Sequence, residues 1–266
     1  MKRIVVSVLV IGFMLTTASW ASSATYDYPL DNKFAATILG TPKEFKAAVP
    51  EKIKFEQKRL TVFPDRVVPE LYFYQKGLEY FMIRQNGPAP LIFMIAGTGA
   101  SHNSAKNKAM GRAFSQAGFH VVSIPSPTHP NFIVTASSTM VPGNLEVDAS
   151  DIYRVMQRIM QDGGKNLQVT DYYLTGYSLG ATQSAYVAKL DEEMQAFNFK
   201  KVLMINPSVS LFNSVELIDD MLEKNIPGGV DNFPAYWNDM FKRFSDAFDQ
   251  SDAVVFGPEF LYKTYE

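Results

Sequence analysis

The sequence of 266 residues contains no cysteine and only three histidines. The absence of cysteine excludes disulfides, thiolate metal sites and cysteine nucleophiles, so any chemistry must use oxygen or nitrogen groups. An excess of one charge is also missing, because 25 basic residues stand against 27 acidic ones. We therefore expect no nucleic acid partner, since such a partner needs a basic surface. The hydrophobic share of 47% is enough for one large α/β domain or two small ones.

Apolar runs long enough to span a membrane, which takes about 20 residues, are absent too. The run Ile4–Leu15 follows two basic residues and precedes small residues up to Ala21, which is the order of a secretory signal peptide. We expect residues 1–21 to be that signal, cleaved after Ala21 or, alternatively, after Ala24, with no stable membrane span afterwards. An uncleaved anchor is the competing interpretation. No cysteine follows the run, which excludes a lipoprotein anchor, so we expect a periplasmic or secreted protein.

Three segments follow the predicted signal. Residues 22–65 are mixed and polar, and we expect an N-terminal arm there. Residues 66–210 alternate between apolar strands and amphipathic helices. This alternation predicts an α/β fold with a mostly parallel sheet flanked by helices. Residues 211–266 are predicted to be a helical, cap-like segment.

An antiparallel hairpin is expected at the start of the alternating segment. Its strands would be Val67–Tyr74 and Leu78–Arg84, with Lys76-Gly77 as the turn. The next strand, Leu91–Ala96, is continuously apolar, as expected of a strand buried on both faces. The remaining predicted elements are strands at 119–124, 172–175 and 201–205, helices at 104–117, 145–160 and 179–193, and a long loop over 125–143.

Two helices are predicted over residues 211–224 and 233–248. Aromatic residues recur on one face of the second helix, and this stripe has two interpretations. Packing toward a core is the ordinary one. The other is a cap over a site, where aromatic side chains line a pocket for an acyl or aryl group. The stripe consists of Phe233, Trp237, Phe241, Phe244 and Phe248.

The sequence Gly176-Tyr177-Ser178-Leu179-Gly180 stands between a predicted strand and a predicted helix. A turn this tight strains the backbone of the serine and leaves no room for side chains two residues to either side, which explains the glycines. Ser178 would also lie at a helix N-terminus, where free N–H groups favour the negative charge that develops in acyl transfer. We therefore predict Ser178 as a nucleophile and the N–H of Leu179 as an oxyanion donor.

A second loop agrees with this prediction. The sequence Gly97-Thr98-Gly99-Ala100-Ser101-His102 follows the buried strand Leu91–Ala96, and its small residues allow backbone N–H groups to face a cavity. Such a loop at the carboxyl end of a neighbouring strand supplies the second oxyanion donor, for which Thr98 is the candidate. The loop lacks the third glycine of a dinucleotide site and the Gly-Lys-Ser/Thr of a phosphate-binding loop.

These features together resemble the α/β-hydrolase superfamily over about residues 66–210. The resemblance rests on the hairpin, the strand ending in Ala-Gly-Thr-Gly, the strand at 119–124 and the strand–Gly-Tyr-Ser-Leu-Gly–helix sequence. It implies Ser178 as the nucleophile, Leu179 as the residue after it and Gly97–Gly99 as the oxyanion loop. Where the family often has His-Gly, this chain has Ala96-Gly97, which leaves the backbone role open.

No histidine follows Ser178, although the resemblance implies the order nucleophile, acid, histidine. Three explanations stay open. The chain could be truncated, so that it ends within the cap. A substitute base could be His129, in the loop after the strand at 119–124, or His102, in the oxyanion loop, because triads are defined by geometry. An ordinary loop role competes for both residues. The third explanation is a non-catalytic protein, and His120, which begins its strand, is expected to be structural in each case.

No triad acid can be assigned. The acidic residues after Ser178 mostly fall on amphipathic helices, where a solvated face is the ordinary expectation, and none follows a strand. The turn Asn206-Pro207-Ser208 closes the strand at 201–205 and could line the site or only form a loop. The acids concerned are Asp191, Asp219, Asp220, Asp231, Asp239, Asp246, Asp249 and Asp252.

The sequence therefore predicts a serine hydrolase that cleaves an ester, thioester or amide through an acyl-enzyme on Ser178. Its substrate would be a small-molecule or lipid-like acyl compound. No cofactor or metal is implied, because the histidines and acids show no ligand spacing of the H-E-x-x-H kind. The alternative is a non-catalytic protein on a degenerate α/β-hydrolase fold that binds a ligand or partner.

Overall fold

A computed structural model of the chain describes residues 31–32, 36, 40–41, 45–50, 52–164 and 166–249. The predicted signal peptide lies outside these residues. The chain divides into two compact units, each described by itself. One is Ala47–Phe233, which contains the sheet, and the other takes in α8 (Phe233–Asp249) from Pro234 onward.

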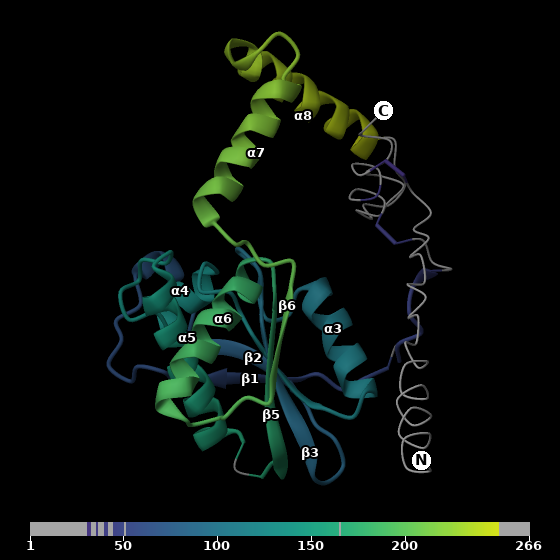
Figure 1. Cartoon of the computed structure of the whole chain (residues 1–266). Helices are drawn as coiled ribbons and strands as arrows, with labels where there is room; N and C mark the ends of the chain where they lie inside the picture. Colours follow the sequence, from purple (N-terminus) through teal and green to yellow (C-terminus); the bar gives the residue numbers. More distant parts are fainter. Residues whose placement is uncertain are drawn as a thin grey trace, which may run out of the picture. The chain divides into compact units, whose positions relative to one another are not determined.

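The first unit is built on a six-stranded sheet with the order β1-β2-β4-β3-β5-β6. Strands β1 and β2 are antiparallel, as are β2 and β4, whereas the other neighbours are parallel (Figure 1). The carboxyl ends of β3, β4, β5 and β6 therefore lie at one edge of the sheet. The bounds are β1 (Glu56–Leu60), β2 (Leu78–Ile83), β3 (Ala89–Ile95), β4 (His120–Ile124), β5 (Val169–Tyr177) and β6 (Lys201–Ile205).

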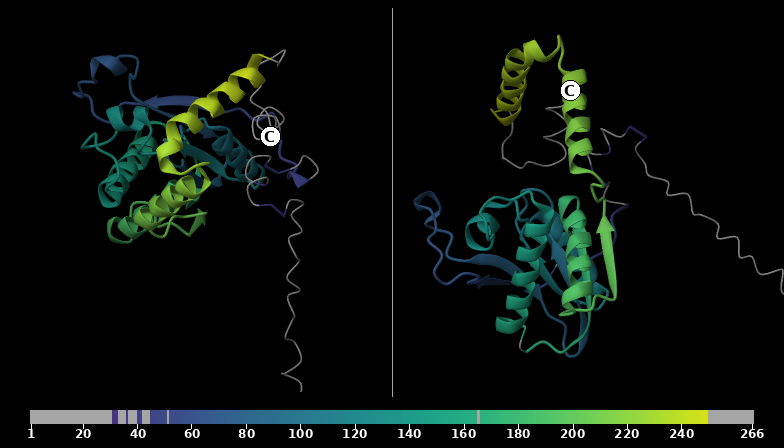
Figure 2. Two further views of the ribbon diagram at one scale, coloured as in Figure 1. Left: turned by 90° about the horizontal axis from the view of Figure 1, so that it is seen from above. Right: turned by 60° about the vertical axis from the view of Figure 1, so that its left-hand side comes forward.

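Helices flank the sheet on both faces. Helix α3 (Ala105–Gln116) covers one face, while α5 (Leu145–Asp162) and α6 (Leu179–Met194) lie against the other (Figure 1). Helices α5 and α6 run side by side, as the two views of Figure 2 show. The predicted fold class, a mostly parallel sheet flanked by helices with an antiparallel pair at its start, is confirmed.

The core has one layer on each face of the sheet. The larger layer joins β3, β4 and β5 to α5 and α6, and its Phe93, Ile152 and Met156 have no exposed surface. The smaller layer lies under α3, where Met110 and Phe114 pack against the buried residues Phe81, Ile83, Ile92, Met94 and Val121. Residues of β3 alternate between the two layers, as expected of the apolar run that predicted a strand buried on both faces.

The predicted hairpin is wrong in its first strand. The partner of β2 is β1, at Glu56–Leu60, which lies within the range predicted as an arm. Residues 67–74 form no strand, and Glu70–Tyr72 is a 3₁₀ helix, η2. Pro69 cannot donate to a strand ladder, and Val67 and Phe73 are 84% and 76% exposed. The search for apolar runs did not predict β1, because its residues, EQKRL, are mostly charged or polar, as is common in edge strands.

A second correction concerns the loop predicted over residues 125–143. It contains a short helix, α4 (Pro130–Thr135), whose Phe132 is fully buried. The other helices lie within two residues of the predicted bounds. They are α3, α5, α6, α7 (Leu211–Asn225) and α8, and a 3₁₀ helix, η3 (Val230–Asn232), lies between the last two. On α8, Trp237 and Phe241 are 44% and 53% exposed, so neither side chain is fully buried.

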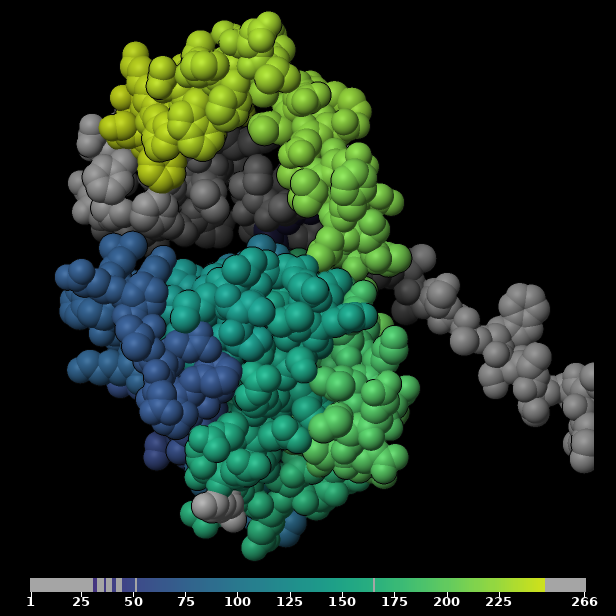
Figure 3. All heavy atoms as spheres, turned by 90° about the vertical axis from the view of Figure 1, so that its left-hand side faces the viewer, coloured from purple at the N-terminus to yellow at the C-terminus, as the bar shows by residue number. Residues whose placement is uncertain are grey.

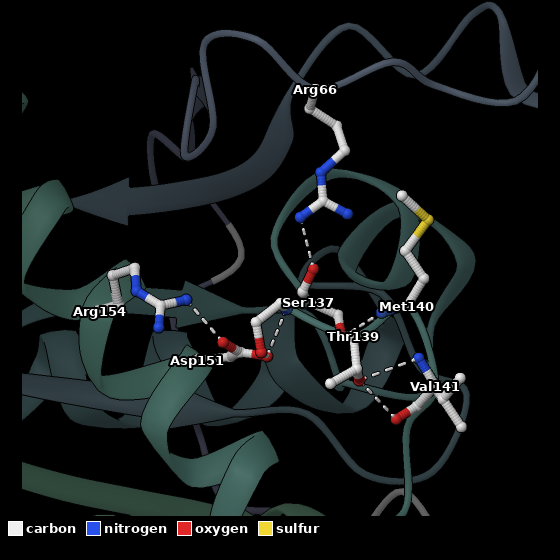
Figure 4. A network of polar contacts seen from close by, with 8 residues as sticks. Arg66, Ser137, Thr139, Met140, Val141, Asp151 and Arg154 are labelled. Atoms are coloured by element: carbon white, nitrogen blue, oxygen red, sulfur yellow. Dashed lines mark hydrogen bonds and ion pairs between the residues drawn. The ribbon is translucent and has the colours of Figure 1, made fainter.

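The chain between β1 and β2 packs against the loop before α5 and against α5 itself. The guanidinium of Arg66 donates to the carbonyl of Ser137 over 2.7 Å. In Figure 3, the atoms of the segment between β1 and β2, in blue, lie beside the teal atoms of α4 and α5. Asp151, which is fully buried, accepts from the backbone N–H of Ser138 and from Arg154 over 2.7 and 2.6 Å (Figure 4). This network holds the loop between α4 and α5 in place.

Candidate active site

Ser178 occupies the turn between β5 and α6. Its backbone has φ 55° and ψ −125°, a conformation that non-glycine residues rarely adopt and that costs about 1–3 kcal/mol. The N–H of Ser178 donates to the carbonyl of Ile205, the last residue of β6, over 2.9 Å. The strained turn predicted for this serine is present, and the neighbouring strand holds it.

Glycines on both sides of Ser178 make this turn possible. A Cβ at Gly176 would lie 2.1 Å from the carbonyl oxygen of Gly180. A Cβ at Gly180 would lie 2.3 Å from the carbonyl oxygen of Ile95, at the end of β3. Both distances are far below contact, so the start of α6 approaches the backbone of β3 as only glycine allows.

The loop after β3 lies directly beside the turn. A Cβ at Gly97 would be 3.0 Å from the carbonyl oxygen of Tyr177 and 3.4 Å from Cβ of Ser178. A cavity of about 270 Å³ opens between the two segments. The residues that line it are Gly97, Thr98, Ala100, Ser104, Lys106, Asn107, Tyr177 and Ser178.

The structure thus brings three of the predicted site residues together. Ser178 and Thr98 line the same cavity, and Leu179 is the first residue of α6. A residue at that position has a backbone N–H without a partner inside its helix, which leaves the group available to an oxyanion.

Hydrogen bonds hold the loop after β3 in place. Gly99 has φ +65°, and its N–H donates to Oγ1 of Thr128 over 2.7 Å. The N–H of Ser126 donates to the carbonyl of Ala100 over 3.0 Å. The chain after β4 therefore fixes the candidate oxyanion loop.

The two candidate bases make other contacts. His102 is 6% exposed, and its Nε2 lies 3.0 Å from Oε1 of Gln57 on β1. Nδ1 of His129 accepts the backbone N–H of Asn131 over 3.2 Å, so this histidine caps α4. Within the described part of the chain, neither histidine lines the cavity beside Ser178. His120 is buried and accepts the N–H of Gln85, which is the structural role expected of it.

Burial perturbs the protonation of these histidines. It lowers the pKa of His102 from 6.5 to about 4, against an opposing effect of Glu79. Burial also lowers the pKa of His129. Both side chains are therefore biased toward the neutral form, in which one ring nitrogen can accept a proton.

Asp191 departs from the expectation of a solvated face. It is 3% exposed at the end of α6, and its carboxylate accepts the hydroxyl of Tyr153 over 2.5 Å. It also accepts the backbone N–H groups of Phe197 and Phe199 over 3.0 and 3.2 Å. These bonds give Asp191 a structural role in the loop before β6.

A hydrogen bond from α6 holds the turn after β6. Asn206 has φ 51°, and the carbonyl of Ser208 accepts the hydroxyl of Thr182 over 2.9 Å. Neither residue of this turn lines the cavity, so the loop-forming interpretation accounts for what the structure shows.

Four lining residues were not singled out from the sequence, and the first of them, Ser104, is the N-cap of α3. Lys106 and Asn107 stand in the first turn of α3, and Tyr177 is the variable position before Ser178. Nζ of Lys106 lies 3.3 Å from the centroid of the Tyr177 ring. A sequence signal did exist, because a lysine at a helix N-terminus opposes the helix dipole.

Among the described residues, no group of three or more histidine, aspartate or glutamate side chains is arranged to hold a metal ion. A search of the same residues for helices with the length and hydropathy needed to cross a membrane finds none.

No protein-family model and no curated protein matches the sequence. Among solved structures, the chain is similar to Est1E from Butyrivibrio proteoclasticus, at 17% identity and a TM-score of 0.37 over 49% of this chain and 47% of that one. It is also similar to a thermostable esterase from Pseudomonas putida, at 13% identity and a TM-score of 0.42 over 66% and 50%. For an acylaminoacyl peptidase from Pyrococcus horikoshii the values are 12%, 0.40, 59% and 23%. The chain thus spans half or less of the length of these structures.

The sheet order and the turn at Ser178 define the fold class. Two antiparallel strand pairs lead into a parallel sheet, and a strained serine joins β5 to α6. Both are features of the α/β-hydrolase fold.

Proposed function

We propose that the protein is a serine hydrolase that cleaves an ester, thioester or amide through an acyl-enzyme on Ser178. The observation that carries this proposal is the strained backbone of Ser178, beside a cavity that it shares with the loop after β3. A structural serine has no need of positive φ, whereas a nucleophile held at a strand-to-helix turn adopts it.

In this mechanism Oγ of Ser178 attacks the carbonyl carbon, and the carbonyl oxygen becomes an oxyanion. The backbone N–H groups of Leu179 and Thr98 would bind that oxyanion. The hydroxyl proton passes to a base, the leaving group departs with a proton, and water then hydrolyses the acyl-enzyme. The candidate bases remain His129 and His102, each of which would have to leave its present hydrogen bond.

Labelling with an uncharged fluorophosphonate tests the nucleophile. We expect covalent labelling of the full-length protein and none of Ser178→Ala. Ser184→Ala is a matched control, because Ser184 lies on the same helix and donates to the carbonyl of Gly180. Labelling that persists in Ser178→Ala would remove the assignment.

Separate His129→Ala and His102→Ala variants test the base. Loss of a base slows labelling of Ser178 by about 10²- to 10⁴-fold. Both variants need a check of their folding by circular dichroism, since both histidines make structural contacts. Rates equal to that of the wild type in both folded variants would exclude a substitute base among these residues.

The second candidate function is that of a non-catalytic binding protein on the same fold. The observation that favours it is the cavity itself, since no histidine of the described residues lines it. A wild-type protein that is folded but takes no fluorophosphonate label at Ser178 would support this alternative.

We further propose that the protein acts in the periplasm or outside the cell, because residues 1–21 have the residue order of a secretory signal peptide. Mass spectrometry of the protein after export would give a mature chain that begins at Ser22, or at Thr25 after the alternative cleavage. Retention of residues 1–21 in a membrane fraction would contradict cleavage.

A further inference from the structure

A lysine ammonium lies in the cavity beside the candidate nucleophile. Lys106 is the second residue of α3, and its Nζ lies 3.3 Å from the centroid of the Tyr177 ring. Tyr177 immediately precedes Ser178, and all three side chains line the cavity. The aromatic ring therefore holds the ammonium beside the nucleophile, since a cation is attracted to the face of a ring.

This ammonium has no carboxylate partner among the described residues. The ion pairs of the described ranges do not include Lys106. Among the described residues that line the cavity, only Lys106 carries a charge. The others contribute backbone, hydroxyl, amide, phenol and methyl groups. The cavity is therefore positive and lacks a counter-ion of its own.

The stability of α3 does not account for a lysine at this position. A cation in the first turn of a helix interacts unfavourably with the helix dipole, and the first turn of α3 contains no acidic residue to offset it. The side chain is also exposed, so it adds no buried core contact. A ligand that brings negative charge accounts for both features.

From these contacts we infer that Lys106 binds an anionic group of the substrate, and that the protein acts on compact esters, thioesters or amides that carry a negative charge close to the scissile bond. This inference rests on the proposed function and names its substrate class. The cavity volume of about 270 Å³ is at the low end for small-molecule sites, which favours a short acyl compound over a long lipid chain.

Matched pairs of esters test the charge on each side of the scissile bond. On the acyl side, the pair is 4-nitrophenyl hydrogen succinate and its methyl ester. On the leaving-group side, the pair is 4-acetoxybenzoate and its methyl ester. For each pair the quantity of interest is the ratio of kcat/KM for the anionic ester to kcat/KM for the neutral one. Inhibition by succinate and by inorganic phosphate then shows which anion the cation prefers.

We expect Lys106→Met to lower this ratio about ten- to a hundredfold for at least one pair, because a hydrogen bond to a charged group is lost. Lys106→Arg should retain most of the ratio, since it retains the charge. Lys108→Met is the matched control, because Lys108 belongs to the same helix and does not line the cavity. Equal ratios in wild type and Lys106→Met for both pairs would overturn the inference.

A binding measurement keeps the test independent of turnover. Titration of Ser178→Ala with both esters of each pair, followed by NMR, gives the affinity ratio without reaction. In the double variant Ser178→Ala/Lys106→Met, the preference for the anionic ester should disappear. Unchanged affinities would overturn the substrate class even if fluorophosphonate still labels wild-type Ser178. Absent labelling with an intact charge preference would instead overturn the proposed hydrolase and leave an anion-binding cavity.

Discussion

Gly180, the second residue of α6, lies against the end of β3, and its replacement by alanine is the sharpest test of this packing. The new Cβ would lie 2.3 Å from the carbonyl oxygen of Ile95 and 2.6 Å from that of Ala96. Ordinary contact begins at 3.4 Å, so the start of α6 would have to move by roughly 1 Å. Both opposing atoms belong to the backbone and cannot rotate away.

The expected cost follows from two opposing effects. Overpacking of this kind costs about 1–3 kcal/mol, and the rigid backbone favours the upper end. The exchange of glycine for alanine within a helix returns about 1 kcal/mol. We therefore expect Gly180→Ala to lose about 2 kcal/mol of stability, which corresponds to a Tm lower by about 4–8 °C for a unit of this size. Labelling of Ser178 should slow as well, because the same shift moves Leu179.

Gly111→Ala is the matched control for this experiment. Gly111 is also helical and buried, but its Cβ would lie 3.3 Å from side-chain atoms of Ile83 and Phe81, which can adjust. We expect its Tm within about 4 °C of the wild type, since the helix propensity gained offsets the tighter contact. Calorimetry of both variants measures the difference. A Gly180→Ala protein that melts at or above the wild-type temperature would refute the close approach of α6 to β3.

Three further predictions concern buried or hydrogen-bonded groups. Because burial lowers the pKa of His102 to about 4, the unfolded chain binds a proton on it below pH 6.5 and the folded chain does not, so stability falls from pH 6.5 toward pH 4. Urea denaturation measures the free energy of unfolding across this pH range, and in His102→Gln its decrease toward pH 4 should be smaller by roughly 2–3 kcal/mol. The same decrease in variant and wild type would contradict this. Asp191→Asn should lower Tm by about 2–12 °C, since an amide NH₂ replaces an acceptor oxygen, whereas the exposed Asp219→Asn should have no effect in the same scan. Thr128→Val removes the acceptor of the Gly99 N–H and should slow fluorophosphonate labelling about three- to tenfold, with a Tm loss of at most about 6 °C; a rate equal to wild type would show that the loop needs no such bond.

The parts of the fold that could be predicted are those whose signal is local. Strands β3, β4 and β6 are apolar runs, and each appears within two residues of its predicted bounds. The turn at Ser178 could be predicted because its glycine pattern is local, and a Cβ at Gly176 would meet the carbonyl oxygen of Gly180, four residues later. Periodicity and turn chemistry express such short-range requirements directly.

The missed parts depend on partners that are distant in sequence. Strand β1 is charged and becomes a strand only because β2, about 20 residues later, offers it an open edge. The apolar residues around Val67 and Phe73 predicted a strand, yet they are exposed, and Pro69 was the one local signal against a strand there. Asp191 looked like an ordinary helix-surface acid because its partner Tyr153 lies 38 residues away.

The residues of the candidate site likewise divide into those with a local sequence signal and those that depend on distant partners. The positions of Ser178, Leu179 and Thr98 follow from two loops at the carboxyl ends of adjacent strands, which the topology brings together. The contacts of His102 and His129 depend on β1 and on the short helix α4, neither of which the sequence pattern indicated. Lys106 lines the cavity because the start of α3 lies beside the turn at Ser178, which the sequence pattern did not indicate.

Strand β6 comes last in the sheet order of the described residues, and its Leu203 and Met204 are about half exposed. It is also the strand whose Ile205 carbonyl holds the N–H of Ser178. Edge strands open locally at a lower free energy than the core around them. Fraying of β6 would release the N–H of Ser178 from its acceptor, so we expect the reactivity of the serine to depend on how firmly this outer strand stays paired.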